Sequence, residues 1–324
     1  MPWQIEARKG FWLPQIGWHL DATDSAPRGI VSHAHADHIG RHREIVCSAP
    51  TARFLRERIP GRREYHILPY GAPEQLTLDC TVTLFPAGHI LGSSLVLLEH
   101  REHGRLLYTG DFRLRPAPTV EPCATPAADV LVMETTFGLP RYVMPPTDMT
   151  HAAIVDFCRR TLADGATPVL HAYTLGKSQE LAFVLNRAGL PAMLPADAWR
   201  LAQIYRECGV DLPQCHPFNQ RDHAGHVVIA PPGSPILQWI HPRRTAAVTG
   251  WAIDSATRYR MGCDEMFALS DHADHEELLT FAGQVRPRTI YTVHGFAREF
   301  AATLRQRGFD AWALGRANQL ELSL

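Results

Sequence analysis

Lysine is almost absent from this 324-residue chain: Lys9 and Lys177 are the only two, so the positive charge is carried almost entirely by arginine. The formal net charge is only −1. Binding of nucleic acid through bulk electrostatics is therefore excluded, and any such binding must come from a local arginine patch. Arginine runs occur at residues 41–43, 53–63, 113–115 and 243–244. Each run taken alone is more typical of a solvated surface.

Paired cysteines are also lacking. The seven cysteines are odd in number and none has C-x-x-C spacing, which excludes a disulfide framework and a thiolate zinc site and favours a reducing compartment. No apolar run reaches the length of a membrane span. The first residues, MPWQIEARKG, lack the apolar core of a signal peptide. Together these absences predict a cytoplasmic protein that does not enter the membrane.

The order of apolar runs predicts one domain interrupted by another. Short strand-like runs fill the first part of the chain, and a proline-rich break follows near residue 142. Strand-like and helix-like runs then alternate, as in a parallel α/β sheet, until a second proline-rich break. We therefore expect a first domain made of residues 1–142 and 246–324, with residues 143–245 inserted.

The stretch IVSHAHADHIG, residues 30–40, contains His33, His35, Asp37 and His38. A chance cluster, a solvated helix face and a histidine-rich tract of loose metal affinity are the alternatives. The strand-like entry argues against a helix face, and the intervening alanines leave room for the polar side chains to converge. The stretch is therefore predicted to supply metal ligands.

Five further polar residues stand at the ends of apolar, strand-like runs: His89, Asp111, Glu134, His272 and His294. The carboxyl ends of strands are where α/β folds place their chemistry. Neutral imidazoles combined with carboxylates suit zinc, or manganese where carboxylates dominate.

This set of motifs resembles the metallo-β-lactamase superfamily, and within it the β-CASP branch that cuts nucleic acids. Asp21, the H-x-H-x-D-H stretch, His89 and Asp111 match the pattern of the superfamily. The β-CASP branch has further motif residues, and these are matched by Glu134, His272 and His294. The resemblance covers nearly the whole chain. It implies an α/β fold: an αββα metallo-β-lactamase sandwich with an inserted β-CASP α/β domain.

The C-terminal stretches FALSDHADHEELL and IYTVHGFAREFAATLRQRGFDAWAL resemble the bacterial ligase-associated DNA exonucleases. One departure is His275, where an aromatic residue is expected. The relation to sister groups is mixed: His294 and Asp274 resemble the messenger-RNA-processing branch, whereas LGKSQEL resembles the crosslink-repair nucleases. The resemblance implies DNA as substrate, with RNA as an alternative, and a functional link to an ATP-dependent DNA ligase.

The resemblance also implies a role for each residue. One metal ion would take His33, His35 and His89; a second would take Asp37, His38 and His294; Asp111 would bridge them. Two adjacent divalent ions, Zn²⁺ or else Mn²⁺, can activate water and hold phosphate oxygens. His272, held by Glu134, is the candidate general acid, and Asp37 counts among the catalytic residues. Asp21 is expected to orient a ligand rather than bind metal.

Two weaker candidates for substrate phosphate contacts are Lys177 and Asp274. The LGKS stretch is not a P-loop, because the first glycine of that motif is replaced by His171. A helix beginning near Gly176 could present its N–H groups to a phosphate, or could be a plain turn into a helix. Asp274 with Glu277 forms a helix start signal, so capping is the favoured role for Asp274.

Three rival functions stand beside the leading one, a two-metal phosphodiesterase that trims DNA from the 5′ end in repair. The first rival is an RNA-processing β-CASP ribonuclease. The second is a small-molecule metallo-hydrolase, which would need neither the insertion nor the Glu134 and His272 pair. The third is a metal-free scaffold, ranked last because every ligand position is filled.

Overall fold

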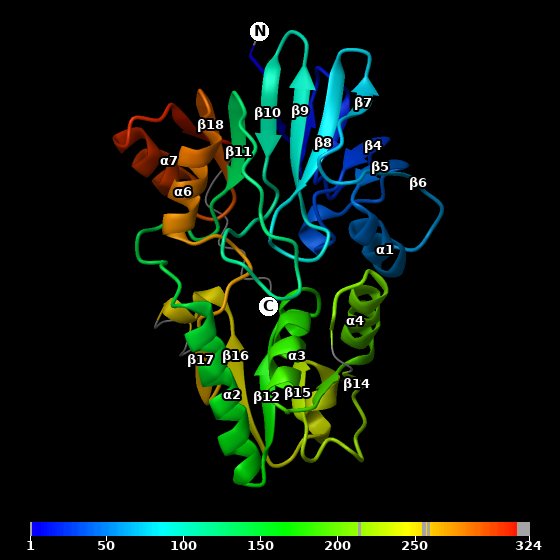
Figure 1. Cartoon of the computed structure of the whole chain (residues 1–324), viewed down its shortest axis with the longest axis vertical. Helices are drawn as coiled ribbons and strands as arrows, with labels where there is room; N and C mark the ends of the chain where they lie inside the picture. Colours follow the sequence, from blue (N-terminus) through cyan, green and yellow to red (C-terminus); the bar gives the residue numbers. More distant parts are fainter. Residues whose placement is uncertain (1, 213–214, 255–256, 258–259, 316–324) are drawn as a thin grey trace. The chain divides into compact units, whose positions relative to one another are not determined.

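The computed structural model describes residues 2–212, 215–254, 257 and 260–315. The chain divides into two compact units. The first unit contains residues 2–142 and continues from residue 272, and the second contains residues 143–271. The described strands form three sheets, two in the first unit and one in the second (Figure 1).

The first sheet is built from the N-terminal part of the chain in the order β1 to β6. Its strands are antiparallel up to β3 and parallel afterwards. They span β1 (Glu6–Ala7), β2 (Phe11–Leu13), β3 (Trp18–Leu20), β4 (Arg28–Ile30), β5 (Glu44–Cys47) and β6 (Glu64–Ile67). A short 3-10 helix, η1 (Ala36–His38), follows β4, and α1 (Ala49–Arg58) joins β5 to β6.

The second sheet has seven strands in the order β19-β18-β11-β10-β9-β8-β7. They span β7 (Glu74–Thr77), β8 (Cys80–Pro86), β9 (Ser94–His100), β10 (Gly104–Tyr108), β11 (Val130–Glu134), β18 (Thr289–Val293) and β19 (Ala311–Ala313). The helices α6 (His275–Val285) and α7 (Ala297–Gln306) complete the first unit.

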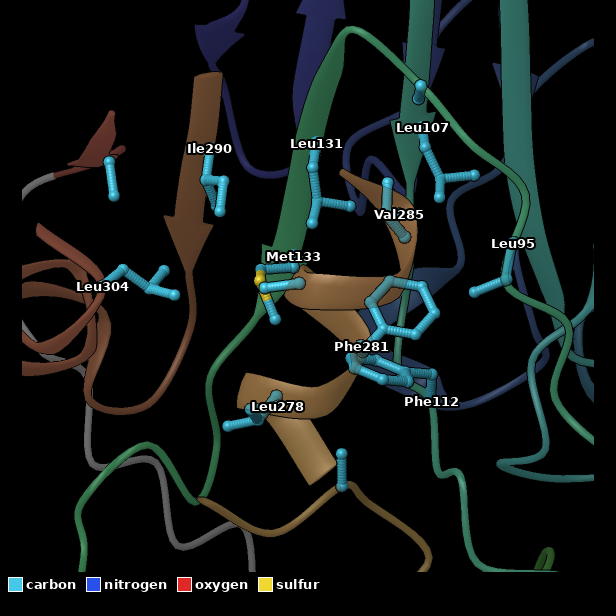
Figure 2. Packing of buried hydrophobic residues seen from close by; sticks show 14 of the residues in the cluster. Leu95, Leu107, Phe112, Leu131, Met133, Leu278, Phe281, Val285, Ile290 and Leu304 are labelled. Atoms are coloured by element: carbon cyan, nitrogen blue, oxygen red, sulfur yellow. The ribbon is translucent and has the colours of Figure 1, made fainter. Parts of the chain in front are cut away.

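Both faces of the second sheet are buried, which explains its continuous apolar runs. Leu95, Leu107 and Leu131 pack with Phe281 of α6 and Leu304 of α7 (Figure 2). Their neighbours in sequence, such as Val96, Leu106 and Val132, point to the opposite face and pack with first-sheet residues such as Leu13, Leu20 and Ile30. This arrangement is the expected αββα sandwich.

The second unit contains one sheet whose paired strands are all parallel, in the order β14-β13-β15-β12-β16-β17. They span β12 (Thr167–His171), β13 (Ala192–Leu194), β14 (His216–Pro217), β15 (Val227–Ala230), β16 (Arg243–Val248) and β17 (Glu265–Phe267). The helices of this unit include α2 (Thr147–Ala163), α3 (Lys177–Arg187) and α4 (Ala196–Glu207), with the 3-10 helices η2 (Pro235–Trp239) and η3 (Gly250–Ile253). The predicted parallel α/β unit is therefore present.

The second boundary differs from the expected position after residue 245. The compact second unit extends to Asp271, because β16 pairs with β12 and β17 pairs with β16. Helix α2 begins after Pro146, its N-cap residue, and no side chain caps it.

All seven cysteines are free. Burial raises the pKa of the Cys47, Cys80, Cys123 and Cys158 thiols to about 12, so these thiols stay protonated. The cytoplasmic location remains a prediction. None of the helices in the described part of the chain combines the length and the apolar character needed to cross a bilayer.

Candidate metal centre

The H-x-H-x-D-H stretch forms the loop after β4 and runs through η1. His33 and His38 are buried, with 0% and 3% exposure, and their rings lie 4.1 Å apart. The Asp37 side chain is 71% exposed. The loop therefore turns histidines inward and presents Asp37 at its surface.

His33, His35, His89 and Asp111 form a group of four in which one potential ligand atom from each residue lies within 4.8 Å of the others. His89 follows β8, and its Nε2 lies 3.0 Å from His35 Nδ1. Asp111 follows β10, and its Oδ2 lies 3.5 Å from His33 Nε2 and 3.7 Å from His89 Nε2. Loops from both sheets thus bring together the first predicted ligand set and the predicted bridging aspartate.

Gly110 lets the end of β10 approach the ligand loop. Its φ of +53° is left-handed, and a Cβ atom there would lie 2.4 Å from Ser32 Oγ. A side chain at this position would collide with Ser32 and strain the backbone, because only glycine tolerates both constraints at low cost.

Asp21 contacts the ligand loop through both of its carboxylate oxygens. Its Oδ1 accepts a hydrogen bond from the Ser32 backbone N–H at 2.7 Å, and its Oδ2 lies 2.9 Å from His38 Nδ1. The Tyr108 hydroxyl donates to the same Oδ2 at 2.9 Å. With Nδ1 held by Asp21, His38 directs Nε2 to Asp111 Oδ2, 3.2 Å away. Such a carboxylate–histidine pair fixes the tautomer of a metal ligand.

The electrostatics of the cluster favour a neutral His33 and an ionised Asp111. Burial, reinforced by His38 and His89, holds the pKa of His33 well below its usual value. Burial opposes charge on His38 as well, but the Asp111 and Asp21 carboxylates outweigh it and raise the His38 pKa well above the usual value. Burial likewise opposes ionisation of Asp111, yet the imidazoles of His38 and His272 hold its pKa well below the usual range.

These residues fit a divalent cation. The buried Nε2 of His33 makes no hydrogen bond, and burying a polar atom without a partner is costly unless something else satisfies it. The donor set of three imidazoles and one carboxylate is typical of zinc. The cluster therefore satisfies the ligand chemistry that the sequence predicted.

The second predicted ligand set is less tightly gathered. Asp37 Oδ2 lies 3.8 Å from His38 Nε2, and the His294 ring lies 5.9 Å from the His38 ring. His294 has a left-handed φ of +59°, and its carbonyl accepts from Thr135 Oγ1 at 2.7 Å. The His294 side chain is exposed, yet desolvation by the protein around it, followed by the nearby His38, lowers its pKa, so it too is available as a neutral ligand.

Glu134 and His272 meet beside the cluster. His272 Nδ1 lies 2.9 Å from Glu134 Oε1, and His272 Nε2 lies 4.0 Å from Asp111 Oδ2. Glu134 is completely buried, and its two oxygens accept from the backbone N–H groups of Phe112 and Thr136 at 3.2 and 3.1 Å. The carboxylate is therefore rigid, and it points the other ring nitrogen of His272 at the cluster.

The two weaker candidates, Lys177 and Asp274, each contact other protein groups in the structure. Lys177 is 2% exposed and its Nζ lies 2.8 Å from Asp271 Oδ1, so its phosphate role stays a prediction that this ion pair disfavours. Asp274 is the N-cap of α6, where its side chain accepts from the Glu277 backbone N–H at 3.0 Å. The favoured capping role is confirmed.

His275 fills the position where an aromatic residue was expected. It is 3% exposed, its Nδ1 lies 3.0 Å from the Gly138 carbonyl oxygen, and its ring meets Phe300 edge-on. The departure from the family pattern therefore affects packing and leaves the metal ligands in place.

Three residues that hold the site in place were not predicted from the sequence: Ser32, Tyr108 and Arg115. Ser32 lies next to a ligand, but Tyr108 is 87 positions from the Asp21 that it contacts. Arg115 donates to the His272 carbonyl oxygen at 3.1 Å and pairs with Asp274 at 2.9 Å. No periodicity or motif links such distant residues, so only the fold reveals them.

Comparison with known proteins supports this interpretation. A family model described as "Zn-dependent metallo-hydrolase RNA specificity domain" matches residues 258–314. A protein named "Probable DNA ligase" from Opitutus terrae is 51% identical over 327 residues, covering 100% of this chain and 32% of that protein. A solved structure titled "Crystal Structure of a Protein of Unknown Function from Enterococcus faecalis V583" has a TM-score of 0.60 at 14% identity, covering 90% of this chain and 80% of that one; it supports the fold alone.

More distant relatives have names that specify nucleases. The "5' exonuclease Apollo" of Rattus norvegicus is 27% identical over 298 residues, covering 85% of this chain and 52% of that protein. An "RNase J-like protein" of Methanocaldococcus jannaschii is 28% identical over 214 residues, covering 56% of this chain and 50% of that protein. The chain spans about half or less of these relatives' own lengths. With the ligand cluster and the two-sheet fold, these similarities show that the chain belongs to the β-CASP branch of the metallo-β-lactamase superfamily.

Proposed function

We propose that the protein is a two-metal phosphodiesterase that hydrolyses DNA, acting as a 5′ exonuclease in DNA repair. The observation that carries this proposal is the Glu134–His272 pair beside the histidine cluster. Hydrolysis of a phosphodiester needs an acid for the departing oxygen. A small-molecule metallo-hydrolase needs no such pair, so its presence favours a nuclease.

Two divalent ions, Zn²⁺ or else Mn²⁺, would be held by the residues of the two ligand sets, with Asp111 shared between them: His33, His35 and His89 for one, and Asp37, His38 and His294 for the other. When bound, they would supply Lewis acidity that activates water and neutralises charge on the phosphate. Asp21 keeps His38 oriented for this task through its 2.9 Å contact to Nδ1.

His272 would hold a proton at Nε2 and donate it to the departing oxygen. Its Nδ1 is occupied by Glu134, so Nε2 is the nitrogen directed at the cluster. Glu134 would stabilise the positive charge of His272 before the transfer. Because backbone N–H groups hold both oxygens of Glu134, the pair needs little rearrangement to act.

DNA is preferred as the substrate because a relative matching the whole chain is named as a DNA ligase and another is named as a 5′ exonuclease. This similarity also supports a functional link to an ATP-dependent DNA ligase. The second unit would be the β-CASP domain. An RNA-processing ribonuclease is the second candidate, favoured by the RNA specificity family model and the RNase J-like relative.

The test is incubation with end-labelled single-stranded DNA, duplex DNA and RNA of matched sequence, with zinc or manganese added. Stepwise shortening of DNA from the 5′ end is expected, faster than cleavage of RNA. Faster cleavage of the RNA would transfer the assignment to the ribonuclease, and cuts in a circular single strand would show an endonuclease. A His272→Ala variant purified in parallel controls for contaminating nucleases.

A further inference from the structure

A basic hollow lies on the first unit, where the segments before β4, before β5 and before β6 meet. It has a volume of about 480 Å³ and is lined by Ser25, Ala26, Pro27, Arg41, His42, Arg43, Arg62 and Arg63. We call Arg41, Arg43, Arg62 and Arg63 the arginine groove. The strands and the helix that carry these segments, β4, β5, β6 and α1, lie together in Figure 1.

The positive charge of the arginine groove is not neutralised within the protein. Arg41, Arg43 and Arg62 are exposed, and none of them forms an ion pair with a residue that the structure describes. Arg63 is half-buried and donates to the Ile59 carbonyl oxygen, so its guanidinium is held in place at the edge. An unpaired cluster of this kind repels itself and therefore favours a polyanionic ligand.

The arginine groove continues to the metal-ligand loop. An adjoining hollow of about 430 Å³ shares Ser25 and Arg41 with it, and Ala36 and Ile39 also line this second hollow. Ala36 and Ile39 stand immediately before and after the ligands at 37 and 38. The acidic residue that lines the second hollow, Asp24, is paired with Lys9 at 3.0 Å. The path from the groove to the ligand loop is thus not blocked by an uncompensated carboxylate.

We propose that the arginine groove binds the sugar–phosphate backbone of the substrate strand and leads it to the metal centre. The inference rests on the proposed nuclease function for the identity of the polyanion. Guanidinium groups bind phosphate oxygens through paired hydrogen bonds, whereas the one aromatic ring in the groove lining, the imidazole of His42, is buried and offers no face on which a base could stack. Recognition would therefore be independent of base sequence, and one local patch suffices in a chain of net charge −1.

The test compares two double variants that remove the same charge. Arg43→Gln with Arg62→Gln changes the groove, whereas Arg298→Gln with Arg307→Gln changes exposed arginines on α7 or just after it. Binding of a fluorescein-labelled phosphorothioate oligothymidylate, which resists cleavage, is followed by fluorescence anisotropy as salt is varied. The groove variant should bind about tenfold more weakly and lose about 0.7 from the salt slope of log K for each phosphate contact removed. The α7 variant should match the wild type.

Each outcome is decisive. Equal binding by the groove variant and the α7 variant would overturn the arginine groove, whatever the cleavage assays show. Weaker binding by the groove variant alone supports it. If the wild type binds the strand but cleaves neither DNA nor RNA, the proposed function fails while the groove stands. Thermal unfolding of both variants, expected to match the wild type because these arginines are exposed, separates lost binding from lost folding.

Discussion

At the residue scale, the predicted metal ligands differ from one another in burial, and this difference predicts unequal effects of substitution. His89 has 1% exposure and Asp111 6%, whereas the Asp37 side chain is 71% exposed. Replacing His89 with alanine removes a nitrogen from a preformed pocket, so this variant should lose more metal than Asp37→Ala. Elemental analysis of the purified proteins is the measurement, with exposed His66→Ala as the control that keeps the wild-type content. Wild-type metal content in Asp37→Ala would remove Asp37 from the site.

His272 should matter for the chemical step and little for metal content. It contacts Glu134 through Nδ1 and lies at the edge of the cluster, so His272→Ala should keep its metal and lose roughly 10²–10⁴ in turnover of DNA, the usual worth of general acid catalysis. Glu134→Gln should act in the same direction more mildly, because the amide still contacts the ring. The measurement is kcat on DNA beside kcat on a nitrophenyl phosphodiester, whose leaving group needs no proton. Equal losses on both substrates would reject the acid role.

Single residues also show which parts of the site could be predicted from the sequence. The histidines and aspartates of the cluster were predictable because their spacing and their positions at the ends of strands can be recognised in the sequence alone. Their supporting partners were not predictable: Ser32 and Tyr108 bind Asp21 only because β4 and β10 end at the same place. Lys177 illustrates the converse, since its motif suggested a phosphate contact while tertiary packing pairs it with Asp271.

At the scale of the element, α6 begins with a capping box, and Arg115 connects the Asp274 of this box to His272 of the candidate site. The Asp274 side chain accepts a hydrogen bond from the Glu277 backbone N–H at 3.0 Å, and the Glu277 side chain accepts one from the Asp274 backbone N–H, also at 3.0 Å. Asp274→Ala should lower the free energy of unfolding by about 1 kcal/mol, the usual worth of an N-cap, whereas Asp274→Asn should retain most of it because the amide oxygen still accepts. Chemical denaturation of both variants measures the difference. Equal destabilisation by Asn and Ala would show that the charge on Asp274, and not the cap, carries the effect.

Arg115 connects this helix start to the candidate acid. Its guanidinium pairs with Asp274 at 2.9 Å and donates to the His272 carbonyl at 3.1 Å, so it is a positioning residue. Lysine cannot reproduce this planar fork. Arg115→Lys should therefore lower kcat on DNA more than kcat on a nitrophenyl phosphodiester, because it acts through the proton donor. Arg101→Lys, an exposed arginine paired with Asp79, is the control. A loss shared equally by both substrates would assign Arg115 to general stability instead.

At the scale of the whole molecule, the interrupted domain could be predicted because two proline-rich breaks flank a change in periodicity. The position of the second boundary could not. Strands β16 and β17 are short and end in apolar residues, and only pairing with β12 assigns β16 to the parallel sheet. Local sequence decides that a segment is a strand, whereas its neighbours decide which sheet it joins.

The last prediction concerns substrate polarity, which depends on the molecule as a whole. We expect removal of nucleotides from the 5′ end of single-stranded DNA, with a preference for a 5′-phosphate. The unpaired charge of the arginine groove lies beside the ligand loop, so a strand held there by its phosphates would place its end near the metal centre, and a terminal phosphate would add a further charge contact. Strands labelled at the 3′ end, with a 5′-hydroxyl or a 5′-phosphate, should give ladders at different rates. The difference should shrink as salt rises, because exposed phosphate contacts are screened. Equal rates at low salt would show that the terminal phosphate is not recognised, and shortening from the 3′ end would reverse the polarity.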